Sequence, residues 1–375
     1  MPGRNDSRCK AVCQPGADLP SRVIGTQAAR SCLSFFPLPE DSGGPAKSGK
    51  GVDLASPAIS VAILSGKFMG FSKIALLLLA AATVSSAVAA ESHIIVDAQT
   101  GFILGSKSGE EKLPVASLTK IATAAVALDW AKLKQAELSS PVEISQAALA
   151  VGGANPIGLQ AGDSLSLRDL IYCALLASDN VAATSLAEYV GTRLPNASGL
   201  GPAGNFVAHM NALARSLGMR RTLFLNPSGF DGDDKKASPF STAADMARLT
   251  RYAYDVPGFP YYVAQASRQI HVIRSGADMP FEIQNTNELL GRDGIDGVKT
   301  GRTRRAGDCL ILSAKRAPES RREGETVFVT PRRIIVVILR SPDRFGEGLS
   351  LIERGWALYD DWAAKGRKTP KSQSL

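Results

Sequence analysis

Residues 114–125 read Pro-Val-Ala-Ser-Leu-Thr-Lys-Ile-Ala-Thr-Ala-Ala, which places a serine and a lysine three positions apart in an alanine-rich stretch. Apolar residues continue at helical spacing, so the sequence predicts a helix over 117–130. Residues three apart share one face of a helix, and the unpaired N–H groups of the first turn favour negative charge. The Ser117 hydroxyl could therefore attack a carbonyl while Lys120 accepts its proton, provided that burial lowers the pKa of the lysine.

A second string, Ser-Asp-Asn at 178–180, lies where one predicted helix gives way to another. The Ser178 hydroxyl could relay a proton to a leaving group, and the Asn180 carboxamide could orient Lys120 and the substrate amide. The same tripeptide is typical of a helix cap, because short polar side chains accept hydrogen bonds from free N–H groups. Ser-x-x-Lys also occurs at residues 7–10, so these strings are not specific by themselves.

A third string, Lys299-Thr300-Gly301, enters a predicted strand. Lys299 and the Thr300 hydroxyl could hold a substrate carboxylate, and Gly301 would leave room for substrate backbone to lie alongside as an added strand. The backbone N–H of Arg302 could join that of Ser117 in an oxyanion hole. The alternative is a plain edge strand whose lysine discourages pairing.

Strand signals lie near both ends of the chain, with helical signals between them. Apolar and β-branched residues predict a hairpin over 94–104 and strands over 297–302, 309–315 and 333–340. A long polar connection is predicted over 317–325, and residues 327–329 would extend a strand until Pro331 interrupts it. Helical spacing predicts further helices at 165–176, 181–190, 205–217, 242–252 and 347–364.

This order predicts an α+β fold, in which one antiparallel sheet is flanked by helices and its N-terminal hairpin pairs with the C-terminal strands. A mostly helical lobe would be inserted in the middle, and the active site would lie in the cleft between lobe and sheet. The last helix carries an apolar stripe, which favours packing on the sheet; a membrane-surface helix is the alternative.

The N-terminal 90 residues are predicted to lie outside the catalytic domain. Residues 69–90 have a short basic start, an apolar run and small residues at the end, as in a secretory signal peptide. Because such a peptide starts a chain, we interpret 1–68 as a non-native or dispensable leader; a genuine disordered extension is the alternative. The catalytic domain would then span 91–364, followed by a basic tail at 365–375.

Neither the net charge nor the cysteines predict a nucleic-acid partner, a metal site or a cofactor. Removing residues 1–90 lowers the net charge from +8 to +4, and no aromatic residues interleave with the basic runs, so no nucleic-acid partner is predicted. Cys173 and Cys309 would remain; two separate buried cysteines are favoured over a disulfide. Neither has ligand residues at metal-binding spacing, so no metal or cofactor is predicted.

From about 92 to 362 the chain resembles the serine D-alanyl-D-alanine carboxypeptidases, the low-molecular-mass penicillin-binding proteins. The resemblance covers the three strings and the segments between them. These segments are Val96–Gly101, Ala116–Ile121, Leu217–Met219 with Thr222 and Phe224, Asn226–Gly229, Ser241–Met246, Asn285–Leu290, Gly294–Gly301 and Ala306-Gly307.

The resemblance implies a β-lactamase/DD-peptidase-like fold and a role for each string. Ser117 would be the nucleophile, Lys120 the base and Ser178 the proton relay. Asn180 would orient the lysine, and the substrate carboxylate would bind at 299–300. The substrates would be peptidoglycan stem peptides, and β-lactams would be covalent inhibitors.

The chain departs from the family at three positions and at its end. It has Asp179 where glycine is more common, Ser228 where histidine is more common, and a cation at Arg302. It also lacks the all-β C-terminal domain and amphipathic anchor of many relatives, so no firm membrane anchor is expected after signal cleavage. A periplasmic location follows from the signal peptide.

Three alternative functions share these strings. A peptidoglycan DD-endopeptidase on the same fold is not separated by sequence. A class A-like β-lactamase needs a deacylating glutamate, and none occurs from Tyr189 to Phe281. A non-catalytic wall-binding protein would have no need of both Ser117 and Lys120.

Overall fold

The structure is a computed structural model that describes residues 89–196, 199–231 and 238–375. The predicted leader and all but the last two residues of the predicted signal peptide lie outside the described residues. The described residues all belong to one compact unit of the chain.

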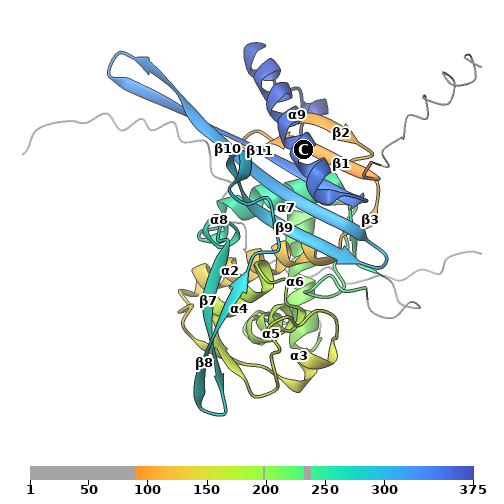
Figure 1. Cartoon of the computed structure of the whole chain (residues 1–375), viewed down its shortest axis with the longest axis vertical. Helices are drawn as coiled ribbons and strands as arrows, with labels where there is room; N and C mark the ends of the chain where they lie inside the picture. Colours follow the sequence, from red (N-terminus) through yellow and green to blue (C-terminus); the bar gives the residue numbers. More distant parts are fainter. Residues whose placement is uncertain (1–88, 197–198, 232–237) are drawn as a thin grey trace, which may run out of the picture. The chain divides into compact units, whose positions relative to one another are not determined.

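The main sheet joins the two ends of the described chain (Figure 1). It has five antiparallel strands in the order β2-β1-β11-β10-β9. Because β1 pairs with β11, the predicted pairing of the N-terminal hairpin with the C-terminal strands is confirmed. The strands are β1 (Ser92–Asp97), β2 (Ile103–Lys107), β9 (Ile295–Thr303), β10 (Gly307–Glu323) and β11 (Thr326–Ser341).

Helices cover both faces of this sheet. Residues 334–339 of β11 read Ile-Ile-Val-Val-Ile-Leu and are all fully buried, the continuous apolar run expected of a strand covered on both sides. Alternate residues of this run pack with the apolar stripe of α9 (Arg344–Ala364). The opposite side meets α7 (Ala243–Asp255), and α8 (Phe259–Val263) contacts β9. The last helix thus packs on the sheet, as predicted.

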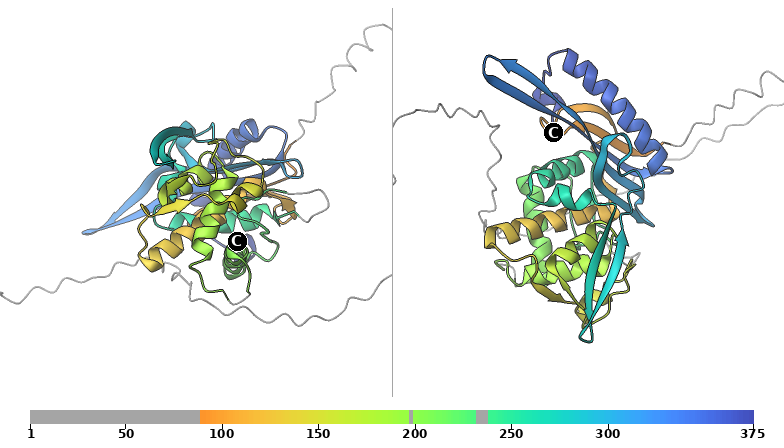
Figure 2. Two further views of the ribbon diagram at one scale, coloured as in Figure 1. Left: turned by 90° about the horizontal axis from the view of Figure 1, so that it is seen from below. Right: turned by 60° about the vertical axis from the view of Figure 1, so that its left-hand side comes forward.

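A mostly helical lobe is inserted between β2 and β9 (Figures 1 and 2). At its centre α2 (Lys120–Lys134) is buried on all sides from Lys120 to Ala131, which explains its many alanines, since small side chains let helices approach closely. The helices around it are α3 (Gln146–Ala150), α4 (Leu167–Leu175), α5 (Asn180–Gly191) and α6 (Pro202–Ser216).

Small sheets border the lobe, and the sequence analysis did not predict them. One has four strands in the order β4-β5-β7-β8, and the other pairs β3 with β6. Their strands are β3 (Leu113–Pro114), β4 (Pro141–Glu143), β5 (Ser164–Ser166), β6 (Phe240–Ser241), β7 (Ser267–Arg274) and β8 (Ala277–Gln284). Short 3₁₀ turns complete the chain at Ala116–Thr119 (η1), Arg292–Gly294 (η2) and Lys371–Gln373 (η3).

The predicted polar connection at 317–325 is wrong. Strand β10 continues to Glu323 and β11 begins at Thr326, so the two strands form one long hairpin. Pro331 does not interrupt β11. The register shifts between the pairs Arg316↔Arg332 and Glu319↔Thr330, so the irregularity accommodates both Pro318 and Pro331 without ending the ladder.

Two further observations concern the cysteines and the membrane. Cys173 and Cys309 are both free and buried, so the interpretation as separate apolar side chains is confirmed. Among the described residues, no helix combines the length and the apolar character that a bilayer span requires.

We predict that Leu312→Ala lowers the free energy of unfolding by about 2–5 kcal/mol, because the truncation leaves a cavity in the core between β10 and α9. Leu312 is fully buried, whereas Leu133 in the last turn of α2 is 51% exposed. Chemical denaturation should show a change below about 1 kcal/mol for the control Leu133→Ala. Equal losses for the two variants would contradict the assigned core.

Candidate active site

Ser117 and Lys120 lie side by side where the chain enters the helical lobe. Ser117 belongs to the 3₁₀ turn η1, and Lys120 is the first residue of α2. The Lys120 Nζ atom lies 2.9 Å from Ser117 Oγ. The predicted helix therefore begins as a 3₁₀ turn, and the predicted sharing of a face by the two side chains is confirmed.

The Lys120 amine is fully enclosed by protein. It is 0% exposed and donates to Asn180 Oδ1 at 2.7 Å and to the Ser228 carbonyl at 3.0 Å. Burial lowers the pKa of Lys120 to about 7, although the nearby Asp179 carboxylate opposes this shift. An amine with this pKa is partly neutral near pH 7, as a general base must be.

The second string serves both as a helix cap and as part of the site. Asp179 is the N-cap of α5 and accepts a hydrogen bond from the Ala182 N–H at 2.8 Å. Asn180 holds Lys120 and also ties down the facing loop, because its backbone N–H donates to the Ala154 carbonyl at 2.8 Å. Ser178 lies in the same turn with φ of 60°, and among the described contacts its hydroxyl makes no hydrogen bond to Lys120.

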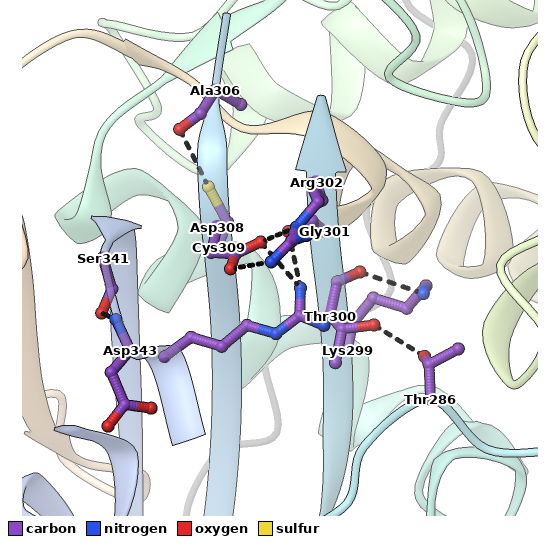
Figure 3. Close-up of polar contacts among 11 residues, drawn as sticks. Thr286, Lys299, Thr300, Gly301, Arg302, Ala306, Asp308, Cys309, Ser341 and Asp343 are labelled. Carbon is purple, nitrogen blue, oxygen red and sulfur yellow. Dashed lines mark hydrogen bonds and ion pairs between the residues drawn. The ribbon is translucent and has the colours of Figure 1, made fainter. Parts of the chain in front are cut away.

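The third string lies on β9, an edge strand of the main sheet (Figure 3). Lys299 is buried and donates to the Thr300 carbonyl at 3.1 Å, and the hydroxyls of Thr300 and Thr286 are 2.6 Å apart. Burial lowers the pKa of Lys299 well below its ordinary value, and the charges of Lys120 and Arg344 act in the same direction. The site thus contains two buried lysines, and the charge of Lys120 disfavours the charged form of Lys299.

Gly301 brings the edge strand against the serine. A Cβ atom at this position would lie 3.2 Å from the Ser117 backbone nitrogen and 3.2 Å from the Val115 carbonyl oxygen. Contacts of that length are tighter than ordinary packing, so glycine permits the close approach. The backbones of β9 and η1 are therefore adjacent where the oxyanion hole was predicted.

The side chain of Arg302 pairs with both oxygens of Asp308 (Figure 3). Arg344, at the start of α9, donates to the Gly301 carbonyl at 3.1 Å and lies 3.3 Å from Asp308. Sequence reasoning missed Arg344 and the Ser228 carbonyl, because both reach the site by tertiary packing and belong to none of the three strings.

A cavity of about 270 Å³ opens over Ser117, between the lobe and the sheet. The lobe contributes Asn180 and the loop that Asn180 ties down, and β9 contributes Arg302. The full lining is Ser117, Gly153, Ala154, Asn180, Phe230, Asp231, Arg302, Thr303 and Arg304. The predicted cleft between lobe and sheet is confirmed. Within the described ranges, no three His, Cys, Asp or Glu side chains gather as metal ligands would.

Solved structures show the same architecture. The Streptomyces K15 DD-transpeptidase matches with a TM-score of 0.59 and 27% identity, covering 72% of this chain and 98% of that one. Penicillin-binding protein D2 from Listeria monocytogenes, in its ampicillin-bound form, matches with a TM-score of 0.55 and 27% identity. The coverage is 71% of this chain and 97% of that one. These matches confirm the predicted β-lactamase/DD-peptidase-like fold.

Curated relatives include both carboxypeptidases and endopeptidases. The D-alanyl-D-alanine carboxypeptidase DacF of Bacillus subtilis is 32% identical over 60% of this chain and 54% of its own length. DacC of Escherichia coli, also named a carboxypeptidase, is 31% identical over 73% of this chain and 62% of its own length. The D-alanyl-D-alanine endopeptidase of Escherichia coli is 34% identical over 62% of this chain and 70% of its own length.

The chain thus spans about half the length of DacF, and somewhat more of the other two relatives. The model of the D-alanyl-D-alanine carboxypeptidase family matches residues 79–322, a stretch that includes all three strings. With the cavity, the paired serine and lysine, and the solved structures of the same fold, this match identifies the chain as a member of the D-alanyl-D-alanine carboxypeptidase family, peptidase family S11.

Proposed function

We propose that this chain is a serine DD-peptidase, which removes the terminal D-alanine from peptidoglycan stem peptides through a penicillin-sensitive acyl-enzyme. The observation that carries the proposal is the 2.9 Å contact between Ser117 Oγ and the buried Lys120 amine, whose pKa is lowered to about 7. The family match and the carboxypeptidase relatives support this choice. The catalytic domain is residues 91–364.

In the acylation step Lys120 takes the proton of the Ser117 hydroxyl, and Oγ attacks the carbonyl carbon of the penultimate D-alanine. The negative charge that develops on the carbonyl oxygen is held by the backbone N–H groups of Ser117 and Arg302. The C–N bond then breaks, and the departing D-alanine amine receives a proton through Ser178. Water later attacks the ester, releases the shortened peptide and regenerates Ser117.

The substrate carboxylate binds Lys299 and Thr300, and its backbone lies beside Gly301 on the edge strand. Burial disfavours the charge of Lys299, and a carboxylate ligand offsets that penalty, so the site favours peptides with a free C-terminus. Asn180 holds both Lys120 and the loop at Ala154, which keeps the lobe side of the cavity in place. β-Lactams react by the same attack and remain bound as esters.

The enzyme is exported by the signal peptide at 69–90 and acts in the periplasm, with residues 1–68 dispensable. The tail at 365–375 does not extend freely, since the Leu375 N–H donates to the Gly101 carbonyl at 3.0 Å.

A DD-endopeptidase is the second candidate, because the Escherichia coli endopeptidase is as similar to the chain as the carboxypeptidases are. A β-lactamase is disfavoured, since residues 190–281 contain no glutamate and the preceding Glu188 accepts a hydrogen bond from Ser145. A non-catalytic wall-binding protein is disfavoured by the contact between Ser117 and Lys120.

We predict that Ser117→Ala abolishes labelling by a fluorescent penicillin. Lys120→Ala should slow labelling by about 100-fold or more, the usual contribution of a positioned base. Circular dichroism and thermal melting check that both variants fold, and Lys134→Ala, at the last residue of the same helix, serves as the control. A covalent adduct that persists in Ser117→Ala would place the nucleophile elsewhere.

We predict that the acylation rate rises with pH and levels off above about 7, the pKa to which burial lowers Lys120. The sign follows because only the neutral amine accepts a proton, so the rate should fall about tenfold per pH unit well below the pKa. Asn180→Asp places a carboxylate beside the amine and should move the midpoint to higher pH. Stopped-flow acylation measures both profiles, and a midpoint that does not move in the variant would exclude Lys120 as the titrating base.

We predict that a pentapeptide ending in D-Ala-D-Ala is cleaved faster than a cross-linked dimer whose scissile D-alanine carries no free C-terminus. The dimer is cross-linked through a lysine side chain, whose leaving amine has no carboxylate on the same carbon, so only the pentapeptide supplies a carboxylate for Lys299. Mass spectrometry of the two digests measures the ratio of kcat/KM. A higher kcat/KM for the dimer than for the pentapeptide would favour the endopeptidase function. A protein that reacts with penicillin but cleaves neither peptide would exclude both peptidase functions.

A further inference from the structure

The long hairpin of β10 and β11 extends past the rest of the main sheet. Strand β9 pairs with β10 only as far as Ala314, and β1 pairs with β11 only as far as Ile334. Beyond these residues the ribbon has two strands and two unpaired edges. We call residues 315–333 the arm, and Figures 1 and 2 show it projecting from the sheet.

Ion pairs fix the base of the arm to the last helix. Asp360 of α9 accepts hydrogen bonds from Arg316 and Arg332, both at 3.0 Å. Glu319 pairs with Arg332 at 3.4 Å and with Arg367 at 2.5 Å. Because α9 and the chain that follows it hold both strands, the base of the arm has a defined direction. The basic residues of these ion pairs outnumber the acidic ones, so the base also carries a net positive charge.

The outer part of the arm exposes apolar residues. Val327, Phe328 and Val329 are 51%, 42% and 58% exposed, and they are consecutive. They belong to the run Thr-Val-Phe-Val-Thr at 326–330, which consists of β-branched and aromatic residues. An exposed edge strand of this composition is a template for pairing with another strand.

The two edges of the arm differ in how readily they could pair with another strand, and the comparison favours the β11 edge. The β10 edge carries Pro318, which lacks an N–H, and the charged run Arg-Arg-Glu at 321–323; both features discourage pairing. The β11 edge has no charge and no proline from Thr326 to Thr330. The edge open to a partner is therefore that of β11.

The sequence of this edge is complementary to itself in the antiparallel direction. A two-fold axis at Phe328 would place Thr326 opposite Thr330 and Val327 opposite Val329, cross-strand pairs that stabilise sheets. The same axis would place Glu325 of each arm opposite Pro331 of the other copy, next to the basic residues Arg332 and Arg333. Two arms joined in this way form a continuous four-stranded sheet.

We propose that the arm is a dimerisation element, and that two copies of this chain pair antiparallel through residues 326–330 of β11 about an axis at Phe328. Binding to an anionic membrane surface is the alternative outcome of the test, because Arg321 and Arg322 lie across from Phe328 and Val327, but only a second copy makes use of the self-complementary order of residues 326–330. Five residues per copy make a small interface, so the dimer should be reversible and depend on concentration.

Cysteine cross-linking tests the register. The full chain is used with Cys9, Cys13 and Cys32 changed to serine in every sample. Phe328→Cys places two thiols across the axis at a separation suited to a disulfide, whereas the matched control Thr326→Cys faces Thr330 of the other copy. We expect about tenfold more disulfide-linked dimer for Phe328→Cys than for Thr326→Cys, on gels run without reductant. Equal or absent cross-linking in the two variants overturns the proposal.

Sedimentation velocity across the micromolar range tests the dimer without added thiols. We expect the unmodified chain to shift from monomer to dimer as its concentration rises. Val329→Lys should weaken the association about tenfold or more, because lysine on an edge opposes pairing. Penicillin labelling should be unchanged in this variant, which shows that the fold is intact. A chain that stays monomeric, or that binds anionic phosphatidylglycerol vesicles through the arm without dimerising, overturns the proposal.

Discussion

The burial of the Lys120 amine is the constraint on which the rest of the site depends. An ordinary lysine has a pKa of 10.5 and is almost fully charged at neutral pH, whereas burial lowers the pKa of Lys120 to about 7. The amine donates to the nearby Ser117 and to oxygen atoms of Asn180 and Ser228, which are 60 and 108 residues away in the chain. Each partner belongs to a different segment, so the lobe must be assembled before the base exists.

The main sheet supplies the other half of the site through an edge strand. Within the described part of the chain only β10 pairs with β9, and the opposite edge of β9 faces Ser117 across the Gly301 contact. Arg344, the first residue of α9, donates a hydrogen bond to the Gly301 carbonyl and so holds β9 in place. The apolar stripe of α9 that stabilises the sheet therefore also sets the position of the strand over the serine, which connects the core of the fold to the geometry of the cavity.

Much of this arrangement could be predicted from sequence where the information is local. The spacing of Ser117 and Lys120, the N-terminal hairpin and the apolar run of β11 each depend on residues close together in the chain. Arg344 and the Ser228 carbonyl could not be found in this way, because they meet the site only after packing. In the arm, strand was correctly predicted at 327–329 but not at 317–323, because both faces of a two-stranded ribbon are exposed and its residues lack the alternation that marks a half-buried strand.

The negative charge of Asp179 opposes the lowering of the pKa of Lys120 by burial. Its carboxylate caps α5, and its charge raises the pKa of Lys120 while burial lowers it. Burial also raises the pKa of Asp179 itself, to about 6, so the carboxylate is ionised at the pH where the lysine begins to lose its proton. Asp179, the N-cap of α5, thus limits how far the pKa of Lys120 is lowered. A glycine at this position, which is more common in the family, would remove both the cap and the opposing charge, so the cap and the strength of the base are set by one side chain.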